Sequence, residues 1–125
     1  MDKIESSETK QYKVVFPSVL NDHDTLFGGM AMQWMDEVAY ITATRFTRMK
    51  MVTVSTGAIQ FRTAIQSGTI AEIVGRVKKV GPIKIEIEVK IFVEEMYKES
   101  RKQAVDAVFT FAAVDKNNKA CRMPF

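Results

Sequence analysis

Cysteine and histidine are scarce in this chain of 125 residues, which contains one of each. The single thiol, Cys121, cannot form an internal disulfide, and such sparse cysteine is typical of a reducing cytosolic compartment. With His23 as the only histidine and no cysteine cluster, the sequence lacks the ligand set of a metal site. It also has no serine nucleophile motif and no partner for Cys121, which argues against triad chemistry. We expect His23 to be a surface residue of a turn-rich loop.

Long apolar runs are absent as well. No segment approaches the roughly 20 apolar residues of a membrane-spanning helix, and the first ten residues, MDKIESSETK, lack the apolar stretch of a signal peptide. We therefore expect a cytoplasmic protein without stable membrane association. The net charge of +3 permits an anionic ligand but is too small for a nucleic-acid-binding surface, so we expect no nucleic-acid partner.

What is present is enough for one folded domain. The length is typical of a single domain, and 46% hydrophobic and 26% charged residues can form a core and a solvated surface. We predict a loose N-terminal tail over residues 1–10 and one domain over residues 11–125.

One long helix is predicted after a polar turn that begins at Asn21. It starts at Gly28-Gly29 and runs to about Thr47 without proline. Its apolar residues cover well over half of its circumference, so we expect burial on most sides. Asp36 lies at the margin of this apolar surface, beside methionines and alanines.

The rest of the chain has the pattern of strands. The clearest alternation covers Ile83–Val93, where isoleucine and valine alternate with lysine and glutamate. Further strands are predicted over Gln11–Phe16, Met51–Phe61 with a bend at Gly57, Thr69–Val80 and Ala104–Val114. The order of one strand, one helix and then strands predicts an α+β fold in which a curved antiparallel sheet wraps round the helix. An open edge strand of such a sheet favours dimerisation by edge pairing.

These motifs together resemble the hotdog-fold acyl-CoA thioesterases, in particular the cytosolic acyl-CoA hydrolase branch. The resemblance rests on five segments in this order, Asn21, Phe27-Gly28-Gly29, Met35-Asp36, Val52-Thr53 and Ile59-Gln60-Phe61, and covers about residues 12–115. It implies hydrolysis of fatty acyl-CoA to a free fatty acid and coenzyme A. No bound cofactor is implied, since coenzyme A is part of substrate and product. The chain departs from the family pattern at Pro82-Ile83-Lys84 and at Gly68-Thr69.

Hydrolysis of a thioester requires an activated water or nucleophile and stabilisation of an oxyanion. The unpaired N–H groups at the start of a helix could stabilise the oxyanion, and Gly28 and Gly29 would let the carbonyl approach them. Alternatively, the glycines only permit a tight turn. Asp36 would be a general base or a nucleophile, and partial burial would make it a better base; the alternative is an ordinary acid on the flank of a helix.

The other candidate residues are supporting ones. Asn21 could orient the water or hold the carbonyl, or be a plain turn residue; the resemblance implies that it faces Asp36 of a neighbouring subunit. Thr53 and Phe27 are further candidates beside the substrate. For the coenzyme A phosphates and pantetheine the candidates are Arg76, Lys79, Gly81 and Lys84, although a solvated strand face explains each basic residue equally well.

Two other functions remain possible for this pattern. One is a non-catalytic hotdog module that binds acyl-CoA, and the other is a hotdog hydratase or dehydratase. The latter usually recruits a histidine base, and His23 precedes the helix without such a setting. For the thioesterase we expect a homodimer that assembles further to a tetramer or hexamer.

Overall fold

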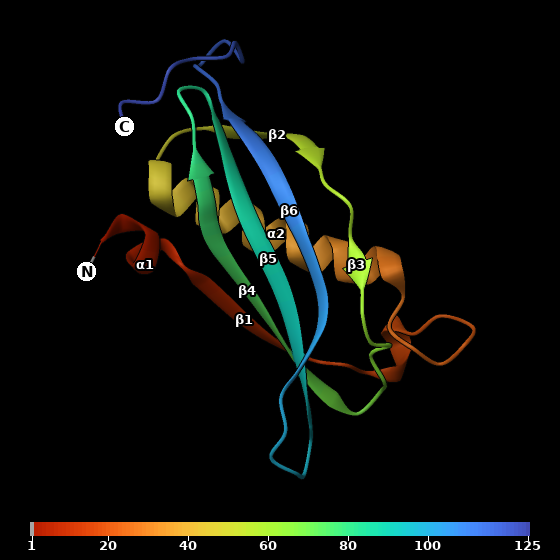
Figure 1. Cartoon of the computed structure of the whole chain (residues 1–125). Helices are drawn as coiled ribbons and strands as arrows, with labels where there is room; N and C mark the ends of the chain where they lie inside the picture. Colours follow the sequence, from red (N-terminus) through yellow and green to blue (C-terminus); the bar gives the residue numbers. More distant parts are fainter. Residues whose placement is uncertain (1) are drawn as a thin grey trace.

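The computed structural model describes residues 2–125. Figure 1 shows one long helix lying across a strongly curved sheet. In chain order the elements are α1 (Lys3–Ser7), β1 (Thr9–Val14), the short 3-10 helix η1 (Pro17–Val19), α2 (Gly28–Thr47), β2 (Met51–Thr56), β3 (Gln60–Phe61), β4 (Thr69–Val80), β5 (Lys84–Glu95) and β6 (Lys102–Ala113). The sheet is antiparallel throughout, with the order β1-β4-β5-β6-β2, and β3 also pairs with β6. The predicted α+β architecture is confirmed.

The core lies between α2 and the concave face of the sheet. On β5 the predicted alternation holds, because Ile85, Ile87, Val89 and Ile91 are fully buried while the lysines and glutamates between them reach solvent. Helix α2 contributes the buried residues Ala31, Trp34, Met35, Val38, Ala39, Thr42, Ala43, Phe46 and Thr47. One layer of sheet covers only one side of this helix. The predicted burial of α2 on most sides is therefore wrong for the single chain, in which Met32 and Tyr40 are exposed.

The predicted strand over residues 51–61 is divided in two. Its first part, β2, pairs with the end of β6, and its second part, β3, pairs with Val105 and Asp106 nearer the start of β6. Between them the N–H of Gly57 donates a hydrogen bond of 2.8 Å to the oxygen of Val108. The bend expected at Gly57 thus lets one edge segment follow the curvature of β6.

The first ten residues differ from the predicted loose tail. They contain α1, and β1 begins at Thr9, two residues before the predicted strand; Met1 lies outside the described residues. The guanidinium of Arg45 on α2 donates hydrogen bonds to the main-chain oxygens of Ser6 (2.7 Å) and Glu8 (3.0 Å). These long-range bonds attach the segment to the end of α2, where local sequence patterns gave no signal.

Candidate active site

The first turn of α2 has main-chain donors without acceptors. Phe27 is the N-cap residue and offers no side-chain cap. Among residues 2–125 no hydrogen bond uses the N–H of Gly28 or of Gly29, whereas the N–H groups of Met30 and Ala31 donate to the oxygen of Phe27. The dipole of a helix of 20 residues adds partial positive charge at this end. This turn can therefore bind a carbonyl oxygen that acquires negative charge.

A cavity on one side of this turn contains the predicted base. It has a volume of about 360 Å³, and we call it the Asp36 cavity. It is lined by Gly29, Met32, Gln33, Asp36, Thr53, Thr56 and Phe109. Three of the predicted residues, Gly29, Asp36 and Thr53, are thus brought together from the helix and from β2.

Asp36 is exposed in the single chain, and this corrects the partial burial expected from the sequence. The reason is that Asp36 lies on the side of α2 that the chain's own sheet does not cover. On the same side of α2, Met32 and Tyr40 expose large apolar side chains to solvent, and the neighbouring edge strand β2 exposes Val52 and Val54. A carboxylate surrounded by exposed apolar side chains is typical of a surface that another chain covers.

A second cavity, of about 380 Å³, lies on the other side of the helix start. We call it the Asn21 cavity, and its lining is Asn21, Thr25, Leu26, Gly28, Ala31, Phe61, Thr63, Ala64 and Ile65. Gly28 lines this cavity and Gly29 lines the Asp36 cavity. The start of α2 therefore separates two cavities, and within one chain Asn21 and Asp36 line different ones.

The side chain of Asn21 shapes its own loop. Its Oδ1 accepts hydrogen bonds from the N–H groups of His23 (2.8 Å) and Thr25 (3.2 Å), and its Nδ2 donates to Oγ1 of Thr25 at 3.0 Å. These bonds show the turn role that was one of the two interpretations. Because a primary amide has two N–H groups and only one is used within residues 2–125, the other is available to a ligand.

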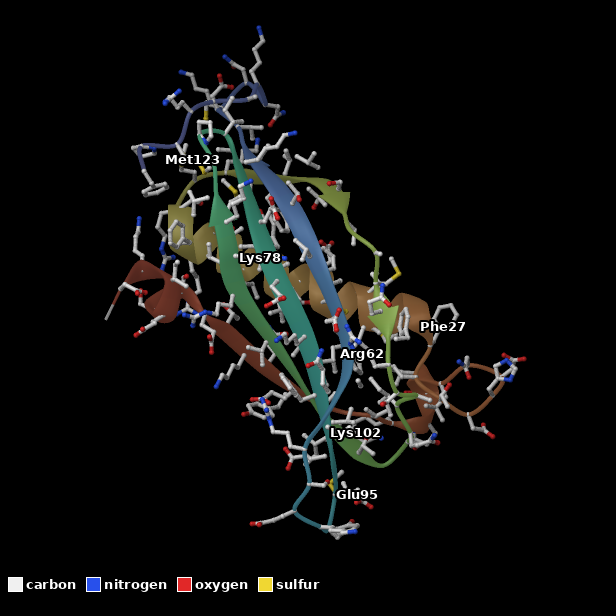
Figure 2. The ribbon with its side chains drawn as sticks, viewed as in Figure 1. Phe27, Arg62, Lys78, Glu95, Lys102 and Met123 are labelled. Atoms are coloured by element: carbon white, nitrogen blue, oxygen red, sulfur yellow. The ribbon has the colours of Figure 1, made fainter. Side chains whose placement is uncertain are left out.

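Phe27 lies over the first turn of α2. Figure 2 shows Phe27 at the start of the helix, on the side of β3. A Cβ placed on Gly29 would be 2.7 Å from Cε2 of the Phe27 ring, closer than atoms of this kind approach. Glycine at this position therefore allows the exposed ring to cover the turn that carries the free donors.

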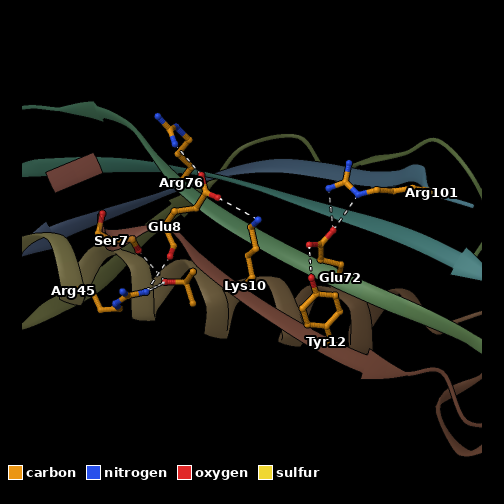
Figure 3. A network of polar contacts seen from close by, with 9 residues as sticks. Ser7, Glu8, Lys10, Tyr12, Arg45, Glu72, Arg76 and Arg101 are labelled. Carbon is orange, nitrogen blue, oxygen red and sulfur yellow. Dashed lines mark hydrogen bonds and ion pairs between the residues drawn. The ribbon is translucent and has the colours of Figure 1, made fainter. Parts of the chain in front are cut away.

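Arg76 is not near either cavity. Its guanidinium donates a hydrogen bond of 2.8 Å to Glu8, on the outer face of the sheet, and this bond raises its pKa against the opposing effect of burial. In Figure 3 this pair lies among the polar contacts that join β4 to the N-terminal segment. The structure thus gives Arg76 a partner within the chain.

The other basic candidates lie at the β4–β5 turn. Lys79 and Lys84 are exposed, and the N–H of Gly81 donates to the oxygen of Lys84 at 2.8 Å. In Figure 1 this turn lies near the end of α2 that is opposite to Gly28. A single chain therefore does not bring these three residues to the start of the helix.

Several lining residues were not predicted from the sequence. Gln33 and Thr56 line the Asp36 cavity, and Phe61 and Ile65 line the Asn21 cavity. Gln33 had a usable signal, because residues three apart on a helix share a face. For Ile65 there was none, since its loop reaches the cavity only through the tertiary fold.

No group of three or more histidine, cysteine, aspartate or glutamate side chains within residues 2–125 is arranged to hold a metal ion. Within the same residues, none of the helices combines the length and apolar character needed to cross a bilayer. His23 is exposed in its loop, 3.7 Å from the equally exposed Asp22, as expected for a surface residue.

Comparison with known proteins identifies the family. Residues 23–100 match the family model described as thioesterase superfamily. The matched segment includes the start of α2 and the residues that line the Asp36 cavity up to Thr56. This chain belongs to the thioesterase superfamily. The resemblance drawn from the sequence is therefore confirmed.

Relatives of known name agree with this membership. The chain is 33% identical over 129 residues to the uncharacterized acyl-CoA thioester hydrolase YkhA of Bacillus subtilis, with 99% of this chain and 75% of that protein covered. It is 32% identical over 120 residues to the cytosolic acyl coenzyme A thioester hydrolase of Rattus norvegicus. That match covers 94% of this chain but only 32% of the rat protein.

Solved structures share the fold. An acyl-CoA hydrolase from Staphylococcus aureus, in complex with butyryl coenzyme A, coenzyme A and coenzyme A disulfide, superposes with a TM-score of 0.91 at 31% identity, covering 97% of this chain and 74% of that one. A hexameric thioesterase from Yersinia pestis superposes with a TM-score of 0.85 at 28% identity, covering 92% and 93%. The predicted hotdog fold is confirmed with them.

The Staphylococcus enzyme has also been solved as three alanine variants. They replace an asparagine, an aspartate fifteen residues later and a threonine seventeen residues after that. In this chain Asn21, Asp36 and Thr53 have the same two spacings.

Proposed function

We propose that this protein is an acyl-CoA thioester hydrolase that converts fatty acyl-CoA and water into a free fatty acid and coenzyme A. One observation carries the proposal: the unpaired N–H groups that start α2 lie between a cavity with a carboxylate and a cavity with a free amide N–H. Membership of the thioesterase superfamily and the names of the relatives support this reaction. The spacing shared with the Staphylococcus variants supports Asn21, Asp36 and Thr53 as its residues.

The proposed reaction begins at the start of α2. The thioester carbonyl oxygen accepts hydrogen bonds from the N–H groups of Gly28 and Gly29, which also stabilise the oxyanion. Asp36 takes a proton from a water molecule as the water oxygen bonds to the carbonyl carbon. The C–S bond then breaks, and the thiolate of coenzyme A leaves and receives that proton. A direct attack by Asp36, which would form a mixed anhydride for water to hydrolyse, uses the same geometry.

We further propose that the active form is a homodimer whose copies pair along β2. This edge strand exposes Val52 and Val54, and the uncovered side of α2 with Asp36 is next to it. A second copy over this surface would bury Asp36 and bring it near Asn21 of the partner. We also propose that the dimers assemble further, to a tetramer or a hexamer. The hexameric thioesterase from Yersinia pestis supports the hexamer.

For coenzyme A we propose contacts with exposed residues of the β4–β5 turn. Lys79 and Lys84 have free ammonium groups for phosphates, and Gly81 permits close approach of the pantetheine. Arg76 is the weaker candidate because Glu8 holds its guanidinium. The protein would act in the cytoplasm, in keeping with its cytosolic relative, without a metal, bound cofactor, nucleic acid or stable contact with a membrane.

The test is thiol release from acyl-CoA substrates of increasing length, from acetyl to palmitoyl. We expect steady turnover by the wild type and a decrease in kcat of about 10² or more for Asp36→Asn, because this change removes the base and keeps the shape. Glu37→Gln is the matched control, since Glu37 is the next acid on the helix and lines neither cavity. Binding without turnover by the wild type would favour the non-catalytic module.

A further inference from the structure

The floor of the Asn21 cavity is apolar and buried. Leu26, Ala31 and Ile65 are 8%, 1% and 4% exposed and form its inner lining, while two of its polar members, Asn21 and Thr25, lie in the loop before the helix. The exposed ring of Phe61 on β3 also lines the cavity, and a Cβ on Gly28 would be 3.7 Å from its Cζ. The cavity thus combines an apolar interior with a donor, the N–H of Gly28, at its boundary.

The walls of this cavity are held by main-chain hydrogen bonds. The N–H of Leu26 donates to the oxygen of Ile65 at 2.8 Å, which joins the two loops that form the floor. On the other side, the N–H groups of Arg62 and Thr63 donate to the oxygen of Ala104 at 2.8 and 3.2 Å and attach the loop to β6. Because both loops are tied by backbone contacts, the floor cannot move away without breaking them.

We infer that the Asn21 cavity receives the acyl chain of the substrate and limits it to short chains, with Ala31 and Ile65 setting the limit. This inference rests on the proposed function. With the carbonyl oxygen on the donors of the helix start, one substituent of the carbonyl carbon extends to each side of that turn. Because Leu26, Ala31 and Ile65 give the Asn21 cavity a buried apolar lining, it is the better place for a hydrocarbon chain.

The volume argues for a short chain. At about 380 Å³ the cavity is near the lower end of the range for small-molecule sites, about 300–1,000 Å³. A long fatty chain would have to leave part of its length in solvent or displace the floor. We therefore expect catalytic efficiency to reach its maximum at a short acyl group and to fall towards palmitoyl-CoA.

Three variants of the floor test this assignment. Ile65→Ala and the milder Ile65→Val lengthen the cavity, and Ala31→Val shortens it. The quantity to measure is the ratio of kcat/KM for octanoyl-CoA to kcat/KM for butyryl-CoA. Since one methylene in a fitted pocket changes discrimination by about tenfold or more, we expect the ratio to rise about tenfold in Ile65→Ala, to rise less in Ile65→Val and to fall about tenfold in Ala31→Val.

Ile87→Val is the matched control for a lost core methylene, because Ile87 on β5 is fully buried and lines neither cavity. The ratio of kcat/KM values for octanoyl-CoA and butyryl-CoA should be the same in Ile87→Val as in the wild type. Thermal unfolding checks that every variant is folded. If the floor variants hydrolyse acyl-CoA but all have the wild-type ratio of octanoyl-CoA to butyryl-CoA efficiency, the assignment of the acyl chain to this cavity is overturned. The proposed hydrolase function would not be affected by that result. Absence of turnover by the wild type on every chain length would instead overturn the proposed function itself.

Discussion

Gly75 decides how closely the central helix approaches the sheet. A Cβ at this position on β4 would be 2.6 Å from Oγ1 of Thr42 and 2.8 Å from Cγ1 of Val38, two side chains on the inner face of α2. Thr42 in turn donates a hydrogen bond of 2.8 Å to the oxygen of Val38. The helix therefore lies directly against the backbone of β4, and this contact helps to set the position from which the start of α2 presents its donors.

Gly75→Ala should lower the free energy of unfolding by about 1–3 kcal/mol, because an added methyl group overpacks a filled core. Denaturant unfolding measures the change. In the double variant with Thr42→Ala the loss should be smaller than the sum of the two single losses by at least about 0.5 kcal/mol. Gly57→Ala is the control, since a Cβ there meets its nearest atom at 3.4 Å. Equal losses in the two glycine variants would contradict close packing at Gly75.

At the scale of elements, polar side chains tie the edge strand β1 to the outer face of the sheet (Figure 3). Glu72 on β4 is 8% exposed and accepts hydrogen bonds from Tyr12 on β1 (2.9 Å) and from Nη2 of Arg101, before β6 (2.9 Å). Burial raises the pKa of the Glu72 carboxyl, but the hydrogen bonds from Arg101 and Tyr12 outweigh it, so the pKa is below its usual value. The same contact raises the pKa of Tyr12.

This cluster predicts a specific loss of stability in acid. Folding lowers the pKa of Glu72, so its ionised carboxylate stabilises the folded protein. This contribution to the free energy of unfolding is complete above the pKa of the unfolded state, near 4.5, and is lost as the pH falls through the lower pKa of the folded state. The melting temperature of the wild type should therefore exceed that of Glu72→Gln at pH 7, and the difference should shrink below about pH 4. Glu88→Gln, at a half-exposed site on β5 whose only ion pair within residues 2–125 is a long one with Lys90, should show little of this behaviour. A difference that stays constant with pH would exclude this role of Glu72.

At the scale of the whole molecule, the single chain has two free sheet edges and an incomplete site. Edge strand β1 carries the polar cluster, whereas edge strand β2 is exposed along nearly its whole length beside the Asp36 cavity. Asn21 and Asp36 line separate cavities in one chain. A site that needs both residues is therefore complete only if two copies share it.

A mixing experiment tests this sharing. Asn21→Ala and Asp36→Ala should each be nearly inactive as separate proteins. After denaturation together in equal amounts and refolding, mixed dimers contain one site with both native residues, so about a quarter of the wild-type activity should return. Refolding each variant alone is the control. Failure of the mixture to regain activity, with dimers present by light scattering, would place both residues in the site of a single chain.

Much of the fold was predictable because its signals are local. The alternation on β5, the absence of proline from α2 and the bend at Gly57 each reflect the chemistry of a few consecutive residues. Predictions that depend on what covers a surface were less accurate. Asp36 was expected to be partly buried and α2 to be buried on most sides, but Met32 and Asp36 are exposed because a single sheet covers only one side of α2. The attachment of the first ten residues by Arg45 involves residues almost 40 positions apart, and no local pattern encodes it.

The sequence by itself determined that this protein is an α+β domain with one long helix, that the helix starts at two glycines, and that Asp36 follows on the same helix. Those features depend on helical and strand periodicity, which short stretches of sequence contain. Only the tertiary structure decided that Gly28 and Gly29 face different cavities, and that the floor of one is formed by Leu26 and Ile65. The hydrogen bond that joins these two residues connects segments separated by the whole of α2 and β2, so their proximity results from the folding of the entire sheet.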